Sequence, residues 1–219
     1  MSRIVIFANG VPGQPELLRT QLRATDRIFC ADGGTNHALA LGLIPEIIAG
    51  DLDSLSADVV AQVAQAGARI QRHPSDKDQT DLELVLELAT AEGPGEIAVV
   101  TALGGRLDQT LANIFLLARP IYDSVRITLI DGSQRAIVLH DRQTVTIDGQ
   151  PGDTLSLVPL TPRVDQVSLT GVKWPLSKAR LAFGSTLSVS NVLTAPPAKV
   201  QIGSGRVLVI HIEQRFEEK

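Results

Sequence analysis

Residues 46–54 read EIIAGDLDS, an apolar run that passes directly into two aspartates. A short apolar run bounded by Gly and Asp is typical of a strand buried on both faces of a sheet. The same pattern recurs along the first 131 residues. Apolar runs of this kind occupy residues 3–8, 27–31, 46–49, 68–71, 96–101 and 125–130.

Segments with helical spacing lie between these runs. Leucine and valine recur over 82–88, and Leu107, Leu111, Ile114, Phe115 and Leu117 share one broad apolar face of a second predicted helix. Alternation of strands and helices predicts an α/β domain with a mostly parallel six-stranded sheet, covered by helices on both faces.

The pattern changes after Asp131 and Gly132. Short runs rich in Val, Ile, Leu, Thr and Ser follow, separated by Pro, Gly, Asp and Asn, which predicts an antiparallel sandwich or barrel. Predicted strands there are 136–140, 144–147, 154–159, 186–192 and 207–212. We therefore expect two domains, 1–133 and 134–219.

Composition excludes several classes of protein. The chain has 219 residues and a net charge of −4, which argues against a nucleic-acid binder held by phosphate contacts. The single cysteine, Cys30, excludes an internal disulfide framework and a zinc site with two thiolates. No apolar run reaches membrane-spanning length, and the first residues do not resemble a signal peptide, so we expect a cytoplasmic protein with no membrane partner. The sequence contains no Walker A motif and no dinucleotide-binding glycine fingerprint.

Polar clusters follow each of the first five predicted strands. They are residues 9–12, 32–36, 50–54, 75–81 and 104–109. The carboxyl ends of parallel strands meet at one sheet edge, where α/β proteins bind ligands. Seven of the 15 aspartates fall in these clusters, and a hard divalent cation such as Mg²⁺ would relieve their mutual repulsion.

Each cluster taken alone also has a structural interpretation. Gly33 and Gly34 suit a tight turn as well as an anion site, and Asp53 suits a helix cap as well as a metal ligand beside Asp51. Acids at 78 and 81 could compensate a helix dipole, and Arg106 could be an ordinary surface residue.

Taken in order, the clusters resemble the thiamine pyrophosphokinase family. The matching segments are ADGGTN at 31–36, GDLDS at 50–54, DKDQTD at 76–81, GGRLDQ at 104–109, GVKWPL at 171–176 and FGSTLSVSN at 183–191. The resemblance implies transfer of the pyrophosphoryl group of ATP to the hydroxyl of thiamine, which gives thiamine diphosphate and AMP. It also implies an α/β domain that binds ATP and Mg²⁺, a β-sandwich that binds thiamine and dimerises, and a homodimer with its site at the subunit interface.

The resemblance assigns roles to individual residues. It implies that Asp51, Asp53 and Asp81 bind Mg²⁺ and that these three and Asp78 are catalytic, with Asp81 or Asp78 as a possible acceptor of the hydroxyl proton. Nucleotide-binding positions would be Asn9, Asp32, Gly33, Gly34, Asn36, Gly104, Gly105, Arg106, Asp108 and Gln109. Thiamine-binding positions would be Trp174, Ser188, Ser190 and Asn191. Two departures are Gln109, where the family commonly has His, and Asp76, where many bacterial members have Glu. Glutamine keeps a hydrogen bond but carries no proton charge near neutrality, which argues against acid–base chemistry at position 109.

Three alternatives remain open at the level of sequence. The acidic loops would also suit a diphosphokinase acting on a pterin alcohol, and Asp51-x-Asp53 would suit a metal-dependent nucleotide-sugar glycosyltransferase. A non-catalytic sensor of thiamine or metal is the third, although it leaves the clustered aspartates unexplained.

Overall fold

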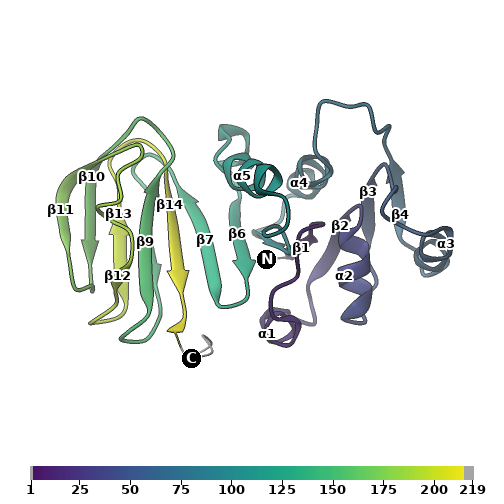
Figure 1. Cartoon of the computed structure of the whole chain (residues 1–219), viewed down its shortest axis with the longest axis horizontal. Coiled ribbons are helices and arrows are strands. Elements are labelled where there is room, and N and C mark those ends of the chain that lie inside the picture. Colours follow the sequence, from purple (N-terminus) through teal and green to yellow (C-terminus); the bar gives the residue numbers. More distant parts are fainter. Residues whose placement is uncertain (1, 215–219) are drawn as a thin grey trace. The chain divides into compact units, whose positions relative to one another are not determined.

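The computed structural model describes residues 2–214 and divides the chain into two compact units (Figure 1). The first ends at Gly132 and the second begins at Ser133. No helix among the described residues is both long and apolar enough to cross a membrane.

The first unit contains a six-stranded parallel sheet, as the sequence predicts. Its strands are β1 (Arg3–Phe7), β2 (Arg27–Ala31), β3 (Ile47–Gly50), β4 (Arg69–Arg72), β5 (Glu96–Val100) and β6 (Arg126–Asp131). They lie in the order β6-β5-β1-β2-β3-β4, and every pairing is parallel. The chain moves from β1 towards β4 and then returns to β5, so the order reverses between β1 and β5. Such a reversal opens a crevice at the carboxyl ends of the strands.

Five α-helices and one 3₁₀ helix connect these strands. They are α1 (Pro15–Gln21), α2 (Gly34–Ala40), α3 (Ala57–Gln65), α4 (Asp81–Ala91), α5 (Leu107–Leu116) and the 3₁₀ helix Pro120–Tyr122. The N-cap of α4 fixes its first turn beside the acidic loops, because the Thr80 hydroxyl accepts a hydrogen bond from the backbone N–H of Glu83 at 3.2 Å.

The second predicted helix is present as α5, but its apolar residues do not all pack into the core. Leu117 is buried at its end, whereas Leu107, Leu111 and Phe115 are 73%, 44% and 49% exposed. The helix instead turns Asn113 and Leu116 inward, and the Asn113 side-chain amide donates to the Ala102 carbonyl at 2.7 Å. That buried polar anchor sets the rotation of the helix and leaves an apolar stripe at i, i+4 and i+8 on its outer side.

The second unit is an antiparallel β-sandwich. Its strands are β7 (Gln134–Leu139), β8 (Thr144–Ile147), β9 (Thr154–Pro159), β10 (Arg163–Thr170), β11 (Leu176–Ala182), β12 (Asn191–Val192), β13 (Ala198–Gln201) and β14 (Val207–Ile212). Within this unit, one sheet has the order β12-β9-β14-β7 and the other β11-β10-β13-β8. Alternating apolar side chains such as Leu155, Leu157, Leu169 and Val209 fill the space between the sheets.

The strand predicted at 186–192 is also wrong, since only Asn191 and Val192 belong to a strand. The Ser188 hydroxyl donates to the Leu157 carbonyl at 2.8 Å, and the backbone N–H of Ser190 donates to the Ser156 hydroxyl at 2.9 Å. Serine side chains therefore provide part of the hydrogen bonding that a ladder would supply, and the chain turns instead of extending. The structure adds β10, β11 and β13 to the strands that the sequence analysis named as examples.

Candidate functional site

A polar cavity of about 490 Å³ opens where the carboxyl ends of the parallel strands meet. Loops after β1, β2, β3 and β5 and the starts of α4 and α5 form its wall, which includes the reversal point between β1 and β5. The residues that line it are Ala8, Asn9, Gly10, Val11, Ala31, Asp32, Asp51, Asp53, Ser54, Thr80, Asp81, Leu82, Ala102, Gly104, Gly105, Arg106, Gln109 and Asn113.

Three carboxylates converge in this cavity. One oxygen from each of Asp32, Asp51 and Asp53 lies within 4.8 Å of the others. Asp32 is 3% exposed, and its Oδ1 is buried with no hydrogen-bond partner among the described residues. A buried carboxylate oxygen that lacks a donor and faces two further carboxylates suits a hard divalent cation. The residues present therefore fit Mg²⁺, and the structure adds Asp32 to the candidate ligands.

Gly50 permits this convergence. A Cβ atom at position 50 would lie 2.9 Å from the Cβ of Asp32 and 3.1 Å from the carboxyl carbon of Asp81. Any side chain at position 50 would thus push apart the carboxylates of Asp32, which follows β2, and Asp81, which begins α4.

Asp81 lies in the same cavity but pairs with a cation of the chain itself. Lys77 Nζ is 3.0 Å from Asp81 Oδ1, in a geometry that forms an ion pair without a well-aligned hydrogen bond. Burial raises the pKa of the Asp81 carboxyl, Lys77 opposes that rise, and the charges of Asp32 and Asp51 add to it. Asp51 behaves in the opposite way, because a hydrogen bond from the backbone N–H of Asp53 at 3.2 Å lowers its pKa.

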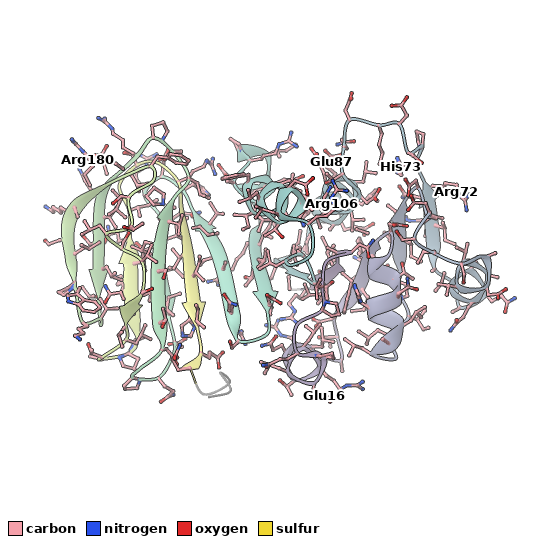
Figure 2. All side chains as sticks on the ribbon, in the orientation of Figure 1. Glu16, Arg72, His73, Glu87, Arg106 and Arg180 are labelled. Atoms are coloured by element: carbon pink, nitrogen blue, oxygen red, sulfur yellow. The ribbon has the colours of Figure 1, made fainter. Side chains whose placement is uncertain are left out.

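The glycine–arginine loop forms the opposite wall. Gly104 and Gly105 have φ angles of 78° and 69°, and a Cβ at Gly104 would lie 3.0 Å from the Cβ of Val11. Arg106 stands at the start of α5 with its side chain 73% exposed, paired with Asp108 at 2.6 Å (Figure 2). A guanidinium held by a surface ion pair can exchange that partner for a phosphate at little cost.

The structure brings together some of the predicted residues and separates others. Asn9, Asp32, Asp51, Asp53, Asp81, Gly104, Gly105, Arg106 and Gln109 line the cavity. Within residues 2–214, the lining does not include Gly33, Gly34, Asn36, Asp78 or Asp108.

The two glycines of α2 have a packing role in the structure. A Cβ atom would lie 2.4 Å from Asn9 Oδ1 at Gly33 and 2.1 Å from the Phe7 carbonyl at Gly34. These glycines thus let the start of α2 pack onto the end of β1. Three further polar lining residues, Ser54, Thr80 and Asn113, were not among the predicted site residues, although Ser54 and Thr80 lie in the predicted polar clusters. The sequence position of Ser54 could have indicated its place in the site, since it directly follows the Asp51-x-Asp53 pair.

A second cavity of about 300 Å³ lies in the β-sandwich. Trp174, Leu176, Leu187, Ser188 and Asn191 line it, and Trp174 is 54% exposed. Asn191 fixes the backbone of the tryptophan, because its Oδ1 accepts from Trp174 N at 3.1 Å and its Nδ2 donates to Trp174 O at 2.7 Å.

The two other predicted thiamine-binding serines differ in their placement. Ser188 is buried and its hydroxyl is bonded to a backbone carbonyl, while Ser190 lies outside this cavity among the described residues. Lys173 Nζ lies 4.6 Å from the Trp174 ring centroid, so the ring face already attracts a cation.

Carboxylates and a glycine–arginine loop at the reversal point of a parallel sheet define a class of enzyme, the nucleotide-dependent transferases. Comparisons with known proteins specify the family. A sequence profile described as thiamin pyrophosphokinase, catalytic domain, matches residues 18–129, and one described as thiamin pyrophosphokinase, vitamin B1 binding domain, matches residues 142–207. The chain belongs to the thiamine pyrophosphokinase family and is an enzyme, a transferase.

Individual thiamine pyrophosphokinases are similar to this chain along most of its length. A thiamine pyrophosphokinase of Bacillus subtilis is 31% identical over 180 residues, which cover 82% of this chain and 84% of that protein. Thiamine pyrophosphokinase 1 of Oryza sativa is 26% identical over 235 residues, with 95% and 86% covered. The crystal structure of a Bacillus subtilis thiamine pyrophosphokinase superposes with a TM-score of 0.86 at 27% identity and covers 97% of this chain and 100% of its own.

Proposed function

We propose that the chain transfers the pyrophosphoryl group of ATP to the hydroxyl of thiamine, which yields thiamine diphosphate and AMP, in a reaction that requires Mg²⁺. Family membership supports the substrates. The observation that carries the proposal is the shared cavity of Asp32, Asp51, Asp53 and the Gly104–Arg106 loop. Pyrophosphoryl transfer depends on neutralising phosphate charge and aligning the reactants, which is the chemistry these groups can supply.

Asp51 and Asp53, with Asp32 and Asp81 beside them, would hold the Mg²⁺ ion. When bound, Mg²⁺ would screen the charge of the phosphate oxygens. Lys77 would then no longer be needed to compensate Asp81, and its ammonium would be free to meet a phosphate.

The chain's own groups would orient the triphosphate. Arg106 would leave Asp108 to form a bidentate contact with phosphate, and Gly104 and Gly105 would let phosphate approach the backbone without a side chain in the way. Gln109 and Asn9 would offer further amides to the nucleotide, since both line the cavity, and the Asn9 amide lies beside the Ser54 hydroxyl at 3.3 Å. The roles predicted for Gly33, Gly34, Asn36 and Asp108 in nucleotide binding stay predictions.

Asp81 or Asp78 would accept the proton of the thiamine hydroxyl. Asp81 lines the cavity and burial raises the pKa of its carboxyl, which favours proton uptake, while Asp78 is exposed outside the cavity. Asp81 would act as the base only while it is not bound to Mg²⁺, because a metal-bound carboxylate is a poor base. The hydroxyl oxygen would attack the β-phosphorus, the bond from that phosphorus to the α-phosphate oxygen would break, and AMP would leave.

Thiamine recognition would use Trp174, whose exposed ring offers a stacking face to a cationic aromatic ligand. Asn191 would hold the backbone of Trp174 in place. Ser188 and Ser190 would hold the neighbouring turn against β9, through their hydrogen bonds to Leu157 and Ser156. The chain would act as a cytoplasmic homodimer with the site at the subunit interface. The exposed apolar side chains Leu107, Leu111 and Phe115 on one unit, and Phe183, Leu187 and Val189 on the other, support burial by a second copy.

One assay tests the proposal. Purified protein is incubated with ATP, Mg²⁺ and thiamine, and AMP and thiamine diphosphate are quantified together. We expect equal amounts of both products, loss of both with EDTA, and at least a hundredfold loss of turnover in Asp51→Asn. Asp58→Asn, an exposed acid in the first turn of α3, is the matched control and should turn over normally.

Two measurements, the AMP assay and thermal unfolding, separate the alternatives. If the folded protein releases AMP with a pterin alcohol but not with thiamine, the substrate is the pterin alcohol. Protection from thermal unfolding by a UDP-sugar but not by ATP would point instead to a glycosyltransferase. Thiamine binding with no AMP production would favour a sensor.

A further inference from the structure

A second cavity of the first unit lies on the other side of the segment that connects β1 to α1. Its volume is about 260 Å³, and it shares no lining residue with the carboxylate cavity among residues 2–214. The connecting segment separates the two cavities, since Gly10 and Val11 line the carboxylate cavity and Pro12 and Gly13 line this one.

The walls of this cavity are mainly apolar. The apolar lining residues include Phe7 of β1, Leu18 of α1, Leu41 after α2 and Ile130 of β6. A cavity of this size that is lined by several elements of one sheet and its helices suits a small organic molecule with an apolar body.

The carboxylate of Asp131 lies in this mainly apolar cavity, whose lining also includes the charged side chains of Glu16 and Arg19. Asp131, at the end of β6, lines the cavity and is half-buried, yet its carboxylate has no hydrogen bond and no ion pair within residues 2–214. Burial alone raises the pKa of the Asp131 carboxyl, since no neighbouring charge contributes to the shift. A partly desolvated carboxylate without a donor is costly and would be relieved by a ligand that brings one.

The neighbouring charged side chains do not supply that donor. Arg19 and Glu16 lie at the α1 side of the cavity, with side chains 55% and 91% exposed, and Arg19 Nε is 3.9 Å from Glu16 Oε2 (Figure 2 labels Glu16). The His37 ring nitrogen Nε2 is 2.9 Å from the Gly10 carbonyl, which commits that nitrogen's proton to the connecting segment.

Two neighbours define the surroundings of Asp131, Gln21 of α1 and Gly13 of the connecting segment. The Gln21 side-chain amide donates to the Gly132 carbonyl at 3.0 Å, which ties α1 to the residue after Asp131. A Cβ atom at Gly13 would lie 2.9 Å from Asp131 Oδ1, so the absence of a side chain at Gly13 leaves that oxygen uncrowded. The Asp131 carboxylate therefore has no side chain against it on its Gly13 side.

We propose that this cavity is a binding site for a small organic cation, in which Asp131 pairs with an ammonium group and Phe7, Leu18, Leu41 and Ile130 enclose an apolar body. The occupant would contact Pro12 and Gly13 on the back of the connecting segment, whose other residues line the carboxylate cavity. The site does not depend on the proposed function, because it shares no residue with the cavity to which that function is assigned.

The test uses the full-length protein and three probes of equal size: benzylamine, benzyl alcohol and benzoate. Binding is followed by the backbone amide NMR signals of Gly13, His37 and Gly132. We expect benzylamine to shift these signals with a millimolar Kd. Benzyl alcohol should bind at least tenfold more weakly, and benzoate should not bind.

Two variants locate the charge that is responsible. Asp131→Asn keeps the shape and should raise the Kd of benzylamine at least tenfold, while Glu16→Gln, which removes an exposed charge at the mouth, should change it less than twofold. Equal affinity for benzylamine and benzyl alcohol, unchanged benzylamine binding by Asp131→Asn, or no shift of the three amides would each overturn the proposal. The amide spectrum of each variant reports whether it is folded.

Discussion

Lys77 lies four residues before Asp81, in the loop that leads into α4, and its ammonium nitrogen is 3.0 Å from Oδ1 of that carboxylate. The side chains of the pair are only 15% and 28% exposed. Lys77 also lowers the pKa of Asp51, although a backbone hydrogen bond is the larger cause there. The lysine thus compensates the carboxylate cluster from within the chain.

Removal of this ammonium should make the protein depend more on Mg²⁺ for stability. In EDTA we expect Lys77→Met to lose about 1 kcal/mol of unfolding free energy, because a partly buried ion pair is broken. Added Mg²⁺ should raise the Tm of Lys77→Met more than that of the wild type. Thermal unfolding with and without Mg²⁺ measures both effects. Lys77→Arg is the control, and an equal Mg²⁺ response in Lys77→Met and wild type would contradict the role given to the lysine.

Gly50 should tolerate no side chain. The Cβ of Gly50→Ala would lie 2.9 Å from Asp32 and 3.1 Å from Asp81, so one of the two carboxylates must move. We expect a loss of about 1–3 kcal/mol in stability and at least a tenfold loss of turnover. Urea unfolding and the AMP assay measure the two effects.

Gly67→Ala is the matched control for that substitution. Gly67 also has positive φ, 95°, but a Cβ there would meet nothing within 4 Å. Gly67→Ala should therefore lower the free energy of unfolding by about 1 kcal/mol through backbone strain and leave turnover intact. Similar losses of turnover in both variants would show that crowding of the carboxylates is not the cause at Gly50.

Trp174 should report thiamine binding through its fluorescence, since it is the only tryptophan of the chain. Its ring is 54% exposed and borders the small cavity of the β-sandwich. We expect thiamine to quench or shift the emission, and Trp174→Ala to weaken thiamine binding by about 0.5–2 kcal/mol, or roughly 2- to 30-fold. An emission spectrum that saturating thiamine leaves unchanged would count against Trp174 as the stacking partner.

Local pattern predicted the six parallel strands and the loops at their ends, because buried strands carry continuous apolar runs and polar residues must lie outside them. The pattern could not show which of the loop residues line the cavity. Asp32 joins the carboxylate group through the approach of β2 and β3 at Gly50, and Asn36 lies behind the cavity lining, where its side-chain amide donates to the Ser54 carbonyl at 3.3 Å. Both outcomes depend on tertiary distances that spacing along one chain does not encode.

The apolar face of α5 shows a second limit. Periodicity identified a stripe of Leu107, Leu111 and Phe115 but not what the stripe faces. Asn113, a polar residue that the periodicity argument gives no weight, is the side chain that fixes the helix rotation through its bond to Ala102. An exposed apolar stripe of this kind therefore needs a separate explanation, which the proposed homodimer supplies.

Disruption of that stripe should separate the subunits. Leu111→Lys places a charge at the middle of the stripe, and we expect sedimentation velocity to show a monomer in place of a dimer. Ile44→Lys, at a residue 46% exposed elsewhere on the first unit, is the control and should remain dimeric. A Leu111→Lys protein that stays dimeric at micromolar concentration would exclude α5 from the interface.

A buried carboxylate in the β-sandwich, Asp153, should make the stability of that unit depend on pH. His211 Nε2 lies 2.9 Å from Asp153 Oδ2, and the backbone N–H groups of Gln150 and Gln214 also donate to this carboxylate. Burial tends to raise the pKa of Asp153, but these three donors together lower it below its ordinary value.

A lowered pKa in the folded state means that protons bind the unfolded chain more readily. The stabilisation is therefore present above the ordinary Asp pKa of about 3.9 and is lost as pH falls towards the lower folded value. We expect Asp153→Asn to cost about 1–3 kcal/mol at pH 6–7, because buried donors lose a charged acceptor, and to cost progressively less below about pH 4. Urea unfolding followed by Trp174 fluorescence reports this unit directly. Asp148→Asn, at an exposed residue of the same unit, should change stability by less than about 0.5 kcal/mol at every pH. A cost of Asp153→Asn that stays constant from pH 7 to pH 3 would mean that the carboxylate's charge does not stabilise the fold.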